Sequence, residues 1–442
     1  MTQTTLPPSS RARGGATAVA VALAAANLLG YSFNLLASRR LGPDGYGAVA
    51  ALLGLVLIGN VIALALQAVV ARRAATVRSA GATAASRPAG SSDSGDPVPE
   101  VMVTAWASRL ASRAGAGLLL FGLLVAPLVT TWLHLASPLS AVWLALTLLP
   151  LTLIGAQLGV LQGSEQFHRL AVLYAVAAAG KVGGGVIGVV VLGSVSGAMG
   201  GTAIGSGLAA AVGSWLVRGP HADAATPGHK VSPGAAREVV HAAYALGALF
   251  ALSNVDIVLA RHFLSAHDAG LYAVGAVVAK GAFWLPSFVP VIALPGLSDP
   301  ERRRATAARA LAVVASSAAV LTLGALAFGP LVVRIVGGSA YSELGDRVWL
   351  FAAAGSLLAV AQVLLYSRLA TEDRRAVVPM WALVLLEVLV IGLWRHGSPT
   401  EIVAVVVCAA LALALAGALM EAVEHGVGRR LTPRSRRASP QA

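Results

Sequence analysis

Polar side chains with the potential for chemistry lie on a single face of one apolar segment near the start of the chain. Asn27, Tyr31 and Asn34 are spaced by four and then three residues, and a helix places residues at that spacing on one face. Each of the three offers hydrogen bonds without a formal charge. The shared face predicts that these side chains line a polar cavity.

Two lysines and one aspartate also lie inside apolar runs. An ionisable side chain at the centre of a bilayer costs about 2.5 to 3.5 kcal/mol, so Lys181, Lys280 and Asp256 are candidates for a cavity lining. Lys181 is the strongest of them, because it lies too deep to extend its ammonium comfortably to either surface. The alternative is that this ammonium reaches a backbone carbonyl among the surrounding glycines.

Asp256 and Lys280 flank one predicted turn. Asp256 lies ten residues before residue 266 and Lys280 fourteen after it, so at 1.5 Å per residue their depths differ by about 6 Å. A lysine side chain can close that gap. The two residues form either a structural ion pair or a proton-or-cation site that a substrate disturbs, and the sequence leaves both interpretations open.

The remaining polar candidates are three amides and two arginines. Asn60 and Gln67 share a helix face, and Asn254 precedes Asp256. Each amide could line a cavity or could bond to a neighbouring helix, an interaction worth about 0.6 kcal/mol on average. Arg39 and Arg261 lie at helix ends, where they would anchor the helices at the interface or meet a phosphate at the mouth of a cavity.

The sequence contains no catalytic signature. It has no HExxH motif, no Walker loop and no cysteine–histidine cluster. We therefore expect no catalytic residue, no metal site and no cofactor, and we expect that the protein is not an enzyme. The single cysteine, Cys408, excludes an internal disulfide and is expected to be a small core residue.

These candidates must be positioned by membrane-spanning helices. Hydrophobic residues make up 57% of the chain and charged residues 12%, which is too apolar for one soluble globule. Apolar stretches of roughly 18 to 25 residues recur, and each is long enough to cross a bilayer as a helix. The predicted spans are 16–36, 47–71, 114–135, 138–161, 170–192, 198–217, 241–262, 270–296, 308–333, 348–367, 376–394 and 400–421.

The basic residues predict the orientation of these spans. With the N-terminus in the cytoplasm, inner segments hold 24 of the 32 basic residues and outer segments hold 6, as the positive-inside rule requires. Both termini are therefore predicted to be cytoplasmic, with the chain in the cell membrane. The net charge of +13 is then explained by anionic lipid headgroups, and we expect no nucleic-acid partner.

An internal repeat predicts two halves. A shift of 223 residues aligns Leu36-Ala37 with Leu259-Ala260 and Gly47 with Gly270, which matches spans 1 and 2 to spans 7 and 8 in the same direction. Parallel repeats of this kind are related by an axis along the membrane normal. The predicted parts are a cytoplasmic tail (1–15), an N-lobe (16–217) with a disordered cytoplasmic loop (79–97), a cytoplasmic linker (218–240), a C-lobe (241–421) and a basic cytoplasmic tail (422–442).

Several segments resemble the polysaccharide flippases of the multidrug/oligosaccharidyl-lipid/polysaccharide exporter superfamily. The similarity covers both halves and is most specific around spans 7 and 8. The segments are Asn34–Gly47, Leu161–Phe167, Asn254–Arg261, Ala269–Tyr272, Leu285–Pro286 and Pro295–Ser298.

The resemblance implies an all-α integral membrane protein of twelve transmembrane helices in two pseudo-symmetric six-helix lobes, the MATE-like flippase fold. It also implies translocation of a polyprenyl-diphosphate-linked oligosaccharide by alternating access, with the bilayer and other glycan-assembly membrane proteins as partners. Asn27, Asn34, Lys181, Asn254, Asp256 and Lys280 occupy positions suited to its cavity. The alternatives are a multidrug/cation antiporter of the same superfamily and a non-transporting scaffold of a glycan-assembly complex.

Overall fold

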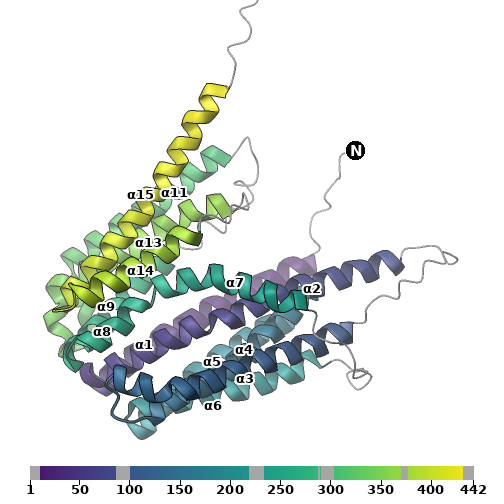
Figure 1. The fold of residues 1–442 in the computed structure, drawn as a ribbon, viewed down its shortest axis with the longest axis horizontal. Coiled ribbons are helices and arrows are strands. Elements are labelled where there is room, and N and C mark those ends of the chain that lie inside the picture. The colour runs from purple at the N-terminus through teal and green to yellow at the C-terminus, as the bar shows by residue number, and fades with distance from the viewer. Residues whose placement is uncertain are drawn as a thin grey trace, which may run out of the picture. The chain divides into compact units, whose positions relative to one another are not determined.

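The computed structural model describes residues 10–85, 100–218, 233–286, 289, 303–369 and 377–431, and within these ranges it contains helices and no strand (Figure 1). The helices of the first part of the chain are α1 (Ser10–Gly59), α2 (Val61–Ala85), α3 (Glu100–Trp132), α4 (Leu139–Gly163), α5 (Phe167–Leu192), α6 (Val195–Val217), α7 (Pro233–Leu252) and α8 (Val255–Phe263). They are followed by α9 (Ala266–Trp284), α11 (Arg303–Ala327), α12 (Gly329–Val336), the 3₁₀ helix η2 (Ser339–Arg347), α13 (Val348–Leu369), α14 (Val377–Leu393) and α15 (Pro399–Leu431).

The helix α1 is broken at a glycine. Gly42 has φ 65° and ψ −179°, a left-handed conformation that glycine adopts without a steric penalty. Pro43 follows and starts the next helical stretch, where its missing N–H costs nothing. The Gly-Pro pair therefore divides α1 between the first two predicted spans.

The helices confirm an all-α membrane fold. Among the described residues, eight helical segments are long and apolar enough to cross a membrane, or nine if α7 and α8, bent by 48°, form one span. One of the eight, Thr17–Ala80, has 64 residues, which at 1.5 Å each is about three times the roughly 30 Å of a hydrocarbon core. This segment therefore holds more than one crossing, and every one of the twelve predicted spans overlaps a helix.

The first compact unit consists of Met1–Val274 and Arg334–Ser342. In it α4 packs against α2, α3 and α6, while α5 packs against α1 and α6. A core cluster joins Leu66 and Val69 of α2 to Ala107 and Ala111 of α3. Small and branched residues therefore hold these helices together, since lipid supplies no hydrophobic driving force between them.

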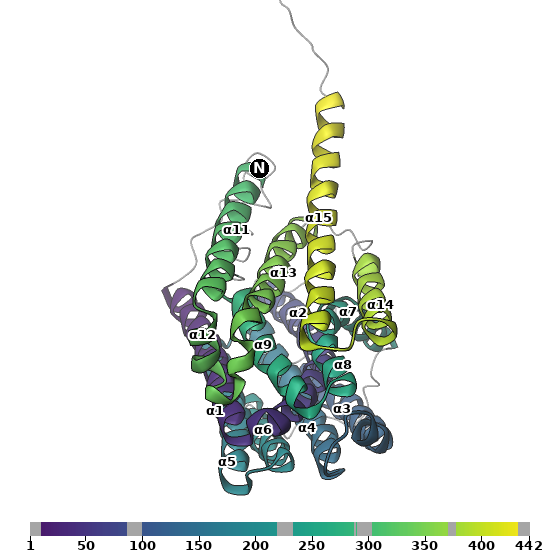
Figure 2. The same cartoon turned by 90° about the vertical axis from the view of Figure 1, so that its left-hand side faces the viewer.

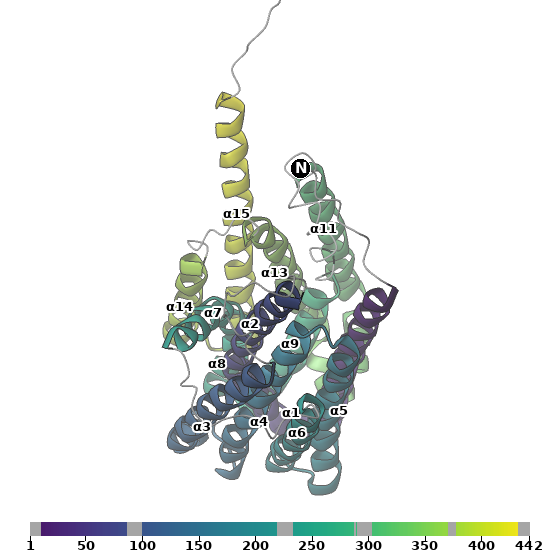
Figure 3. The same cartoon turned by 90° about the vertical axis from the view of Figure 1, so that its right-hand side faces the viewer.

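Glycines form the contact between α5 and α6, which lie side by side in Figure 3. A Cβ added at any of these glycines would come within 3.0 Å of a backbone oxygen of the facing helix. The two backbones thus touch directly, as in small-residue packing of membrane helices. The glycines, spaced by four on each helix, are Gly180, Gly184 and Gly188 on α5 and Gly197, Gly201 and Gly205 on α6.

The second compact unit consists of Gly275–Val333 and Glu343–Ala442. Here α13 packs against α11 and α15, and α14 packs against α15 (Figure 2). Phe283 of α9 joins a core cluster with Val314 of α11 and Val363 of α13. A Cβ on Gly355 of α13 would collide with the carbonyl of Ala279, so α9 and α13 also cross at close range.

The structure corrects the predicted bounds of two connecting segments and the predicted burial of Cys408. The helix α2 runs to Ala85 and so enters the loop predicted as disordered over 79–97, while α7 begins at Pro233, inside the predicted linker. The helices continue past the apolar runs because ion pairs from Arg73 and Arg78 of α2, and from Glu238 of α7, hold these ends in place. Residues 86–99 and 219–232 lie outside the described part. Cys408 is exposed, so its expected place in the core is wrong.

Candidate functional site

The predicted polar face of α1 contains one residue that is hydrogen-bonded within the described part of the protein and two that are not. Asn34 donates through Nδ2 to the Gly30 carbonyl at 2.8 Å, and its Oδ1 accepts from the Tyr46 hydroxyl at 2.9 Å. Asn27 is exposed. The Tyr31 hydroxyl is buried and has no hydrogen-bond partner among the described residues. Buried hydroxyls normally have a partner, so Tyr31 and Asn27 are the groups of this face that can receive a ligand.

Lys181 lies near the middle of α5, fourteen residues after Phe167 and eleven before Leu192. The parallel helices α1 and α5 fix its depth, because Gly15 contacts Phe167 and Phe33 contacts Gly185. Both pairs are 152 positions apart, so Lys181 lies level with residue 29. Its half-buried side chain is therefore at the depth of Asn27 and Tyr31, and the structure brings these three predicted residues to one level.

Gln67 belongs to a polar network between three helices. Its Nε2 donates to Gln162 Oε1 of α4 at 3.0 Å and to the Tyr174 hydroxyl of α5 at 2.8 Å. Asn60, which shares its predicted face, lies half-buried at the junction of α1 and α2, where its carbonyl accepts from the Leu64 N–H at 3.1 Å. Gln67 thus joins three helices, and its place in a cavity stays a prediction.

Asn254 and Asp256 lie at the bend between α7 and α8. Asn254 is buried, and its Nδ2 donates to the Phe250 carbonyl at 2.8 Å. Asp256 Oδ2 accepts from the Tyr272 hydroxyl at 2.7 Å. Lys280 is half-buried in the second unit, and its pairing with Asp256 stays a prediction.

The two predicted arginines make contacts with backbone carbonyls. Arg261 is buried, and its guanidinium donates to the carbonyls of Leu133 at 3.1 Å, His134 at 3.3 Å and Asp44 at 3.5 Å. Arg39 is exposed, and its Nη2 donates to the Ile335 carbonyl at 2.7 Å. These bonds connect helix ends, and the phosphate-binding role of both residues stays a prediction.

Charged contacts join α2 to its neighbours. They lie near the end of α2 that the distribution of basic residues predicts to be cytoplasmic. Arg73 pairs with Glu238 of α7 at 3.0 Å and lies 4.8 Å from the centre of the Trp106 ring. Arg78 pairs with Glu165 in the turn between α4 and α5. This ion pair lowers the pKa of the Glu165 carboxyl, first through the hydrogen bond from Arg78 and also through its charge.

The two repeat-related turns meet at their aligned glycines. A Cβ on Gly47 would lie 2.9 Å from the Gly270 nitrogen and 3.0 Å from the Ala269 carbonyl carbon. Equivalent positions of two copies can touch in this way only beside the axis that relates them. For the predicted repeat, this contact would put the axis between Gly47 and Gly270, and the repeat itself stays a prediction.

Solved structures that the chain resembles include three membrane transporters. An inward-facing multidrug resistance MATE transporter of the MOP superfamily aligns with a TM-score of 0.70 at 11% identity, over 92% of this chain and 96% of its own. The lipid II flippase MurJ aligns at 0.64 and 12% identity over 92% and 87% of the two chains. A eukaryotic MATE transporter aligns at 0.55 and 12% identity over 96% of each.

The chain has the MOP transporter fold. Identities this low establish a shared fold and do not extend to a shared substrate. No family model and no curated protein sequence matches the chain.

Three tyrosines form hydrogen bonds with predicted site residues, and the sequence did not identify these tyrosines. Tyr46, Tyr174 and Tyr272 bond to Asn34, Gln67 and Asp256, respectively. A tyrosine in an apolar run looks like a packing residue, because most of its surface is a ring. The signal that could have found them is a tyrosine hydroxyl at the depth of a predicted amide or carboxylate.

Proposed function

We propose that the protein moves a polyprenyl-diphosphate-linked oligosaccharide from the cytoplasmic to the outer leaflet by alternating access. The observation that carries this proposal is the position of Lys181, midway along α5 and level with Asn27 and Tyr31. A cation held at this depth is a binding group for an anion that enters the membrane interior. The diphosphate of a lipid-linked oligosaccharide is such an anion, and it forms charge-assisted hydrogen bonds with an ammonium.

The neutral groups at the depth of Lys181 fit the rest of such a headgroup. An oligosaccharide presents many hydroxyls, and an exposed amide at Asn27 with the buried Tyr31 hydroxyl can exchange hydrogen bonds with them. The absence of acidic residues from predicted spans 1 to 6 also keeps repulsion of a diphosphate low in that half.

A genetic complementation experiment tests this function. Deletion of the gene should stop surface polysaccharide and accumulate its lipid-linked precursor at the cytoplasmic face, and the wild-type gene should restore export. The double variant Lys181→Ala, Lys280→Ala should fail to restore it, whereas Lys230→Ala, which removes the third lysine of the chain, should succeed. Full export by the double variant would overturn the role given to the lysines and would favour a scaffold.

A multidrug/cation antiporter is the second candidate, favoured by the similarity to a multidrug resistance MATE transporter at a TM-score of 0.70. The deletion strain separates the two. Normal polysaccharide together with reduced efflux of a cationic dye would support the antiporter and contradict the flippase. A flippase predicts the reverse, with unchanged dye efflux and a stalled precursor.

A further inference from the structure

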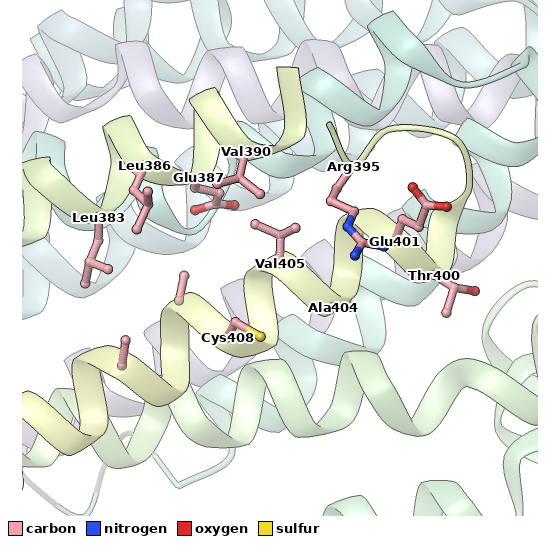
Figure 4. Close-up of a pocket in the computed structure, with 12 residues that line it drawn as sticks. Leu383, Leu386, Glu387, Val390, Arg395, Thr400, Glu401, Ala404, Val405 and Cys408 are labelled. Carbon is pink, nitrogen blue, oxygen red and sulfur yellow. The ribbon is translucent and has the colours of Figure 1, made fainter. Parts of the chain in front are cut away.

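A groove with a volume of about 640 Å³ lies between α14 and α15 in the second unit (Figure 4). Its floor is formed by Ala404, Cys408 and Ala412, which are spaced by four residues and therefore share one face of α15. Leucine and valine side chains of α14 form the opposite wall. The small residues of α15 leave an apolar trough where two helices would otherwise pack.

The length of the groove matches one leaflet of a bilayer. Its lining runs along α15 from Thr400 to Ala412, twelve residues that rise about 18 Å. Half of a hydrocarbon core is about 15 Å. A single acyl chain therefore fits along the groove.

A positive charge lies at one end of the groove. Arg395 lines that end with an exposed side chain, next to the exposed Trp394. Glu401 at the same end caps α15, because its Oε2 accepts from the Gly397 N–H and its own N–H bonds to the Ser398 hydroxyl, both at 3.3 Å. Tryptophan and arginine are the residues that meet lipid headgroups at a membrane interface.

The helix α14 is held by a narrow strip of buried residues, namely Met380, Val384, Glu387 and Ile391. Glu387 is 1% exposed and lies in the groove wall, where an occupant of the groove would separate it further from water. An acyl chain in the trough would give α14 a second apolar contact with α15.

We propose that this groove binds one anionic membrane phospholipid, with an acyl chain along Ala404, Cys408 and Ala412 and its phosphate against Arg395. The site is independent of the proposed function, because its lining includes none of the lysines that carry the latter and it requires no transported substrate. The bound lipid completes the packing between α14 and α15. By the predicted orientation, the headgroup lies in the outer leaflet.

Native mass spectrometry of the full chain tests this proposal. The protein is purified with an equal mixture of phosphatidylglycerol and phosphatidylcholine, and the retained lipid is identified. We expect one retained phosphatidylglycerol, preferred by about fivefold from a single interfacial arginine. Arg395→Gln should abolish the preference, whereas Arg347→Gln, which neutralises another exposed arginine, should leave it unchanged.

A substitution that fills the groove provides a second test. Cys408→Trp should prevent retention of the lipid, and Leu411→Trp, at an exposed position outside the groove lining, should not. If Cys408→Trp fails to fold, maleimide labelling of the native Cys408, which is the single cysteine, replaces it. Labelling should then be several-fold slower in phosphatidylglycerol nanodiscs than in phosphatidylcholine ones. Equal labelling, or an unchanged lipid preference in Arg395→Gln, would overturn the proposal.

Discussion

Tyr31 and Tyr46, which lie on either side of the break at Gly42 in α1, illustrate how two tyrosines can serve different purposes. The Tyr46 hydroxyl donates to Asn34, whereas the Tyr31 hydroxyl is buried and has no partner among the described residues. A satisfied hydroxyl stabilises the fold. An unsatisfied one costs free energy, which a protein retains where a ligand uses it.

The first prediction compares these two residues. Tyr46→Phe should lower the free energy of unfolding by about 0.5 to 1.5 kcal/mol, because a hydrogen bond is lost, and should change transport little at temperatures where the protein stays folded. Tyr31→Phe should leave stability equal or higher and should reduce transport. Thermal unfolding and the export assay measure the two effects, and unimpaired export by Tyr31→Phe would remove this residue from the cavity.

The second prediction concerns the pH dependence of the Arg78–Glu165 pair. Because Arg78 lowers the pKa of Glu165 below its ordinary value of 4.5 in the folded state, the pair stabilises the protein above that value. This contribution is lost as the pH falls through the lowered pKa. Wild type and Glu165→Gln should therefore differ in unfolding temperature at pH 7 and converge at lower pH. The effect should be small, since the pair is exposed.

At the residue scale, the sequence predicted which side chains are polar within the membrane but not what each one contacts. The face of α1 with Asn27, Tyr31 and Asn34 followed from helical periodicity alone. The bond between Asn34 and Tyr46 depends on the turn at Gly42. The bonds of Arg261 depend on two turns, the one that presents the Asp44 carbonyl and the one that presents the carbonyls of Leu133 and His134. Spacing along one helix contains no information on such contacts.

At the scale of helices, the glycine contact between α5 and α6 gives the third prediction. Gly184→Ala should lower stability by about 1 to 3 kcal/mol, because its Cβ would collide with the Gly201 carbonyl and force the backbones apart. Gly183→Ala is the matched control, since nothing lies within 4 Å of its Cβ. The control should be neutral or stabilising, because alanine favours a helix over glycine by about 1 kcal/mol.

Thermal unfolding of both variants in the same detergent measures the difference. An equal response at positions 183 and 184 would contradict the direct backbone contact.

Hydrophobic length predicted the helices well and their ends less well. All twelve predicted spans overlap a helix, because a bilayer admits few other structures for an apolar stretch. The ends of α2 and α7 extend further than predicted. Apolar runs end at the membrane surface, whereas Arg73 and Glu238 pair α2 with α7 in water. Such pairs join residues 165 positions apart, which no local pattern reveals.

At the scale of the whole molecule, the fourth prediction tests the orientation of the chain. In a Cys408→Ser background, Ala224→Cys in the predicted linker should react with an impermeant maleimide only after the cytoplasmic face is opened. Ala136→Cys in the turn between α3 and α4 should react in intact cells. Reaction of Ala224→Cys from outside would invert the predicted topology and exclude loading of a cytoplasmic substrate by the proposed route.

The predicted two-fold repeat rested on a few identities in a chain rich in alanine and leucine. Gly47 and Gly270, which the repeat aligns, lie in contact in the structure, and the repeat itself stays a prediction. The division into lobes at the linker stays a prediction, because the chain between α6 and α7 lies outside the described residues.

The meeting of Gly47 and Gly270 has a mechanical consequence. The atoms nearest to each glycine are mostly backbone atoms of the facing segment, so few side chains at this point resist a small rotation of one segment over the other. We expect this point to serve as a fulcrum when the halves rock. A bulky residue at either glycine would then block this motion, whereas substrate could still enter.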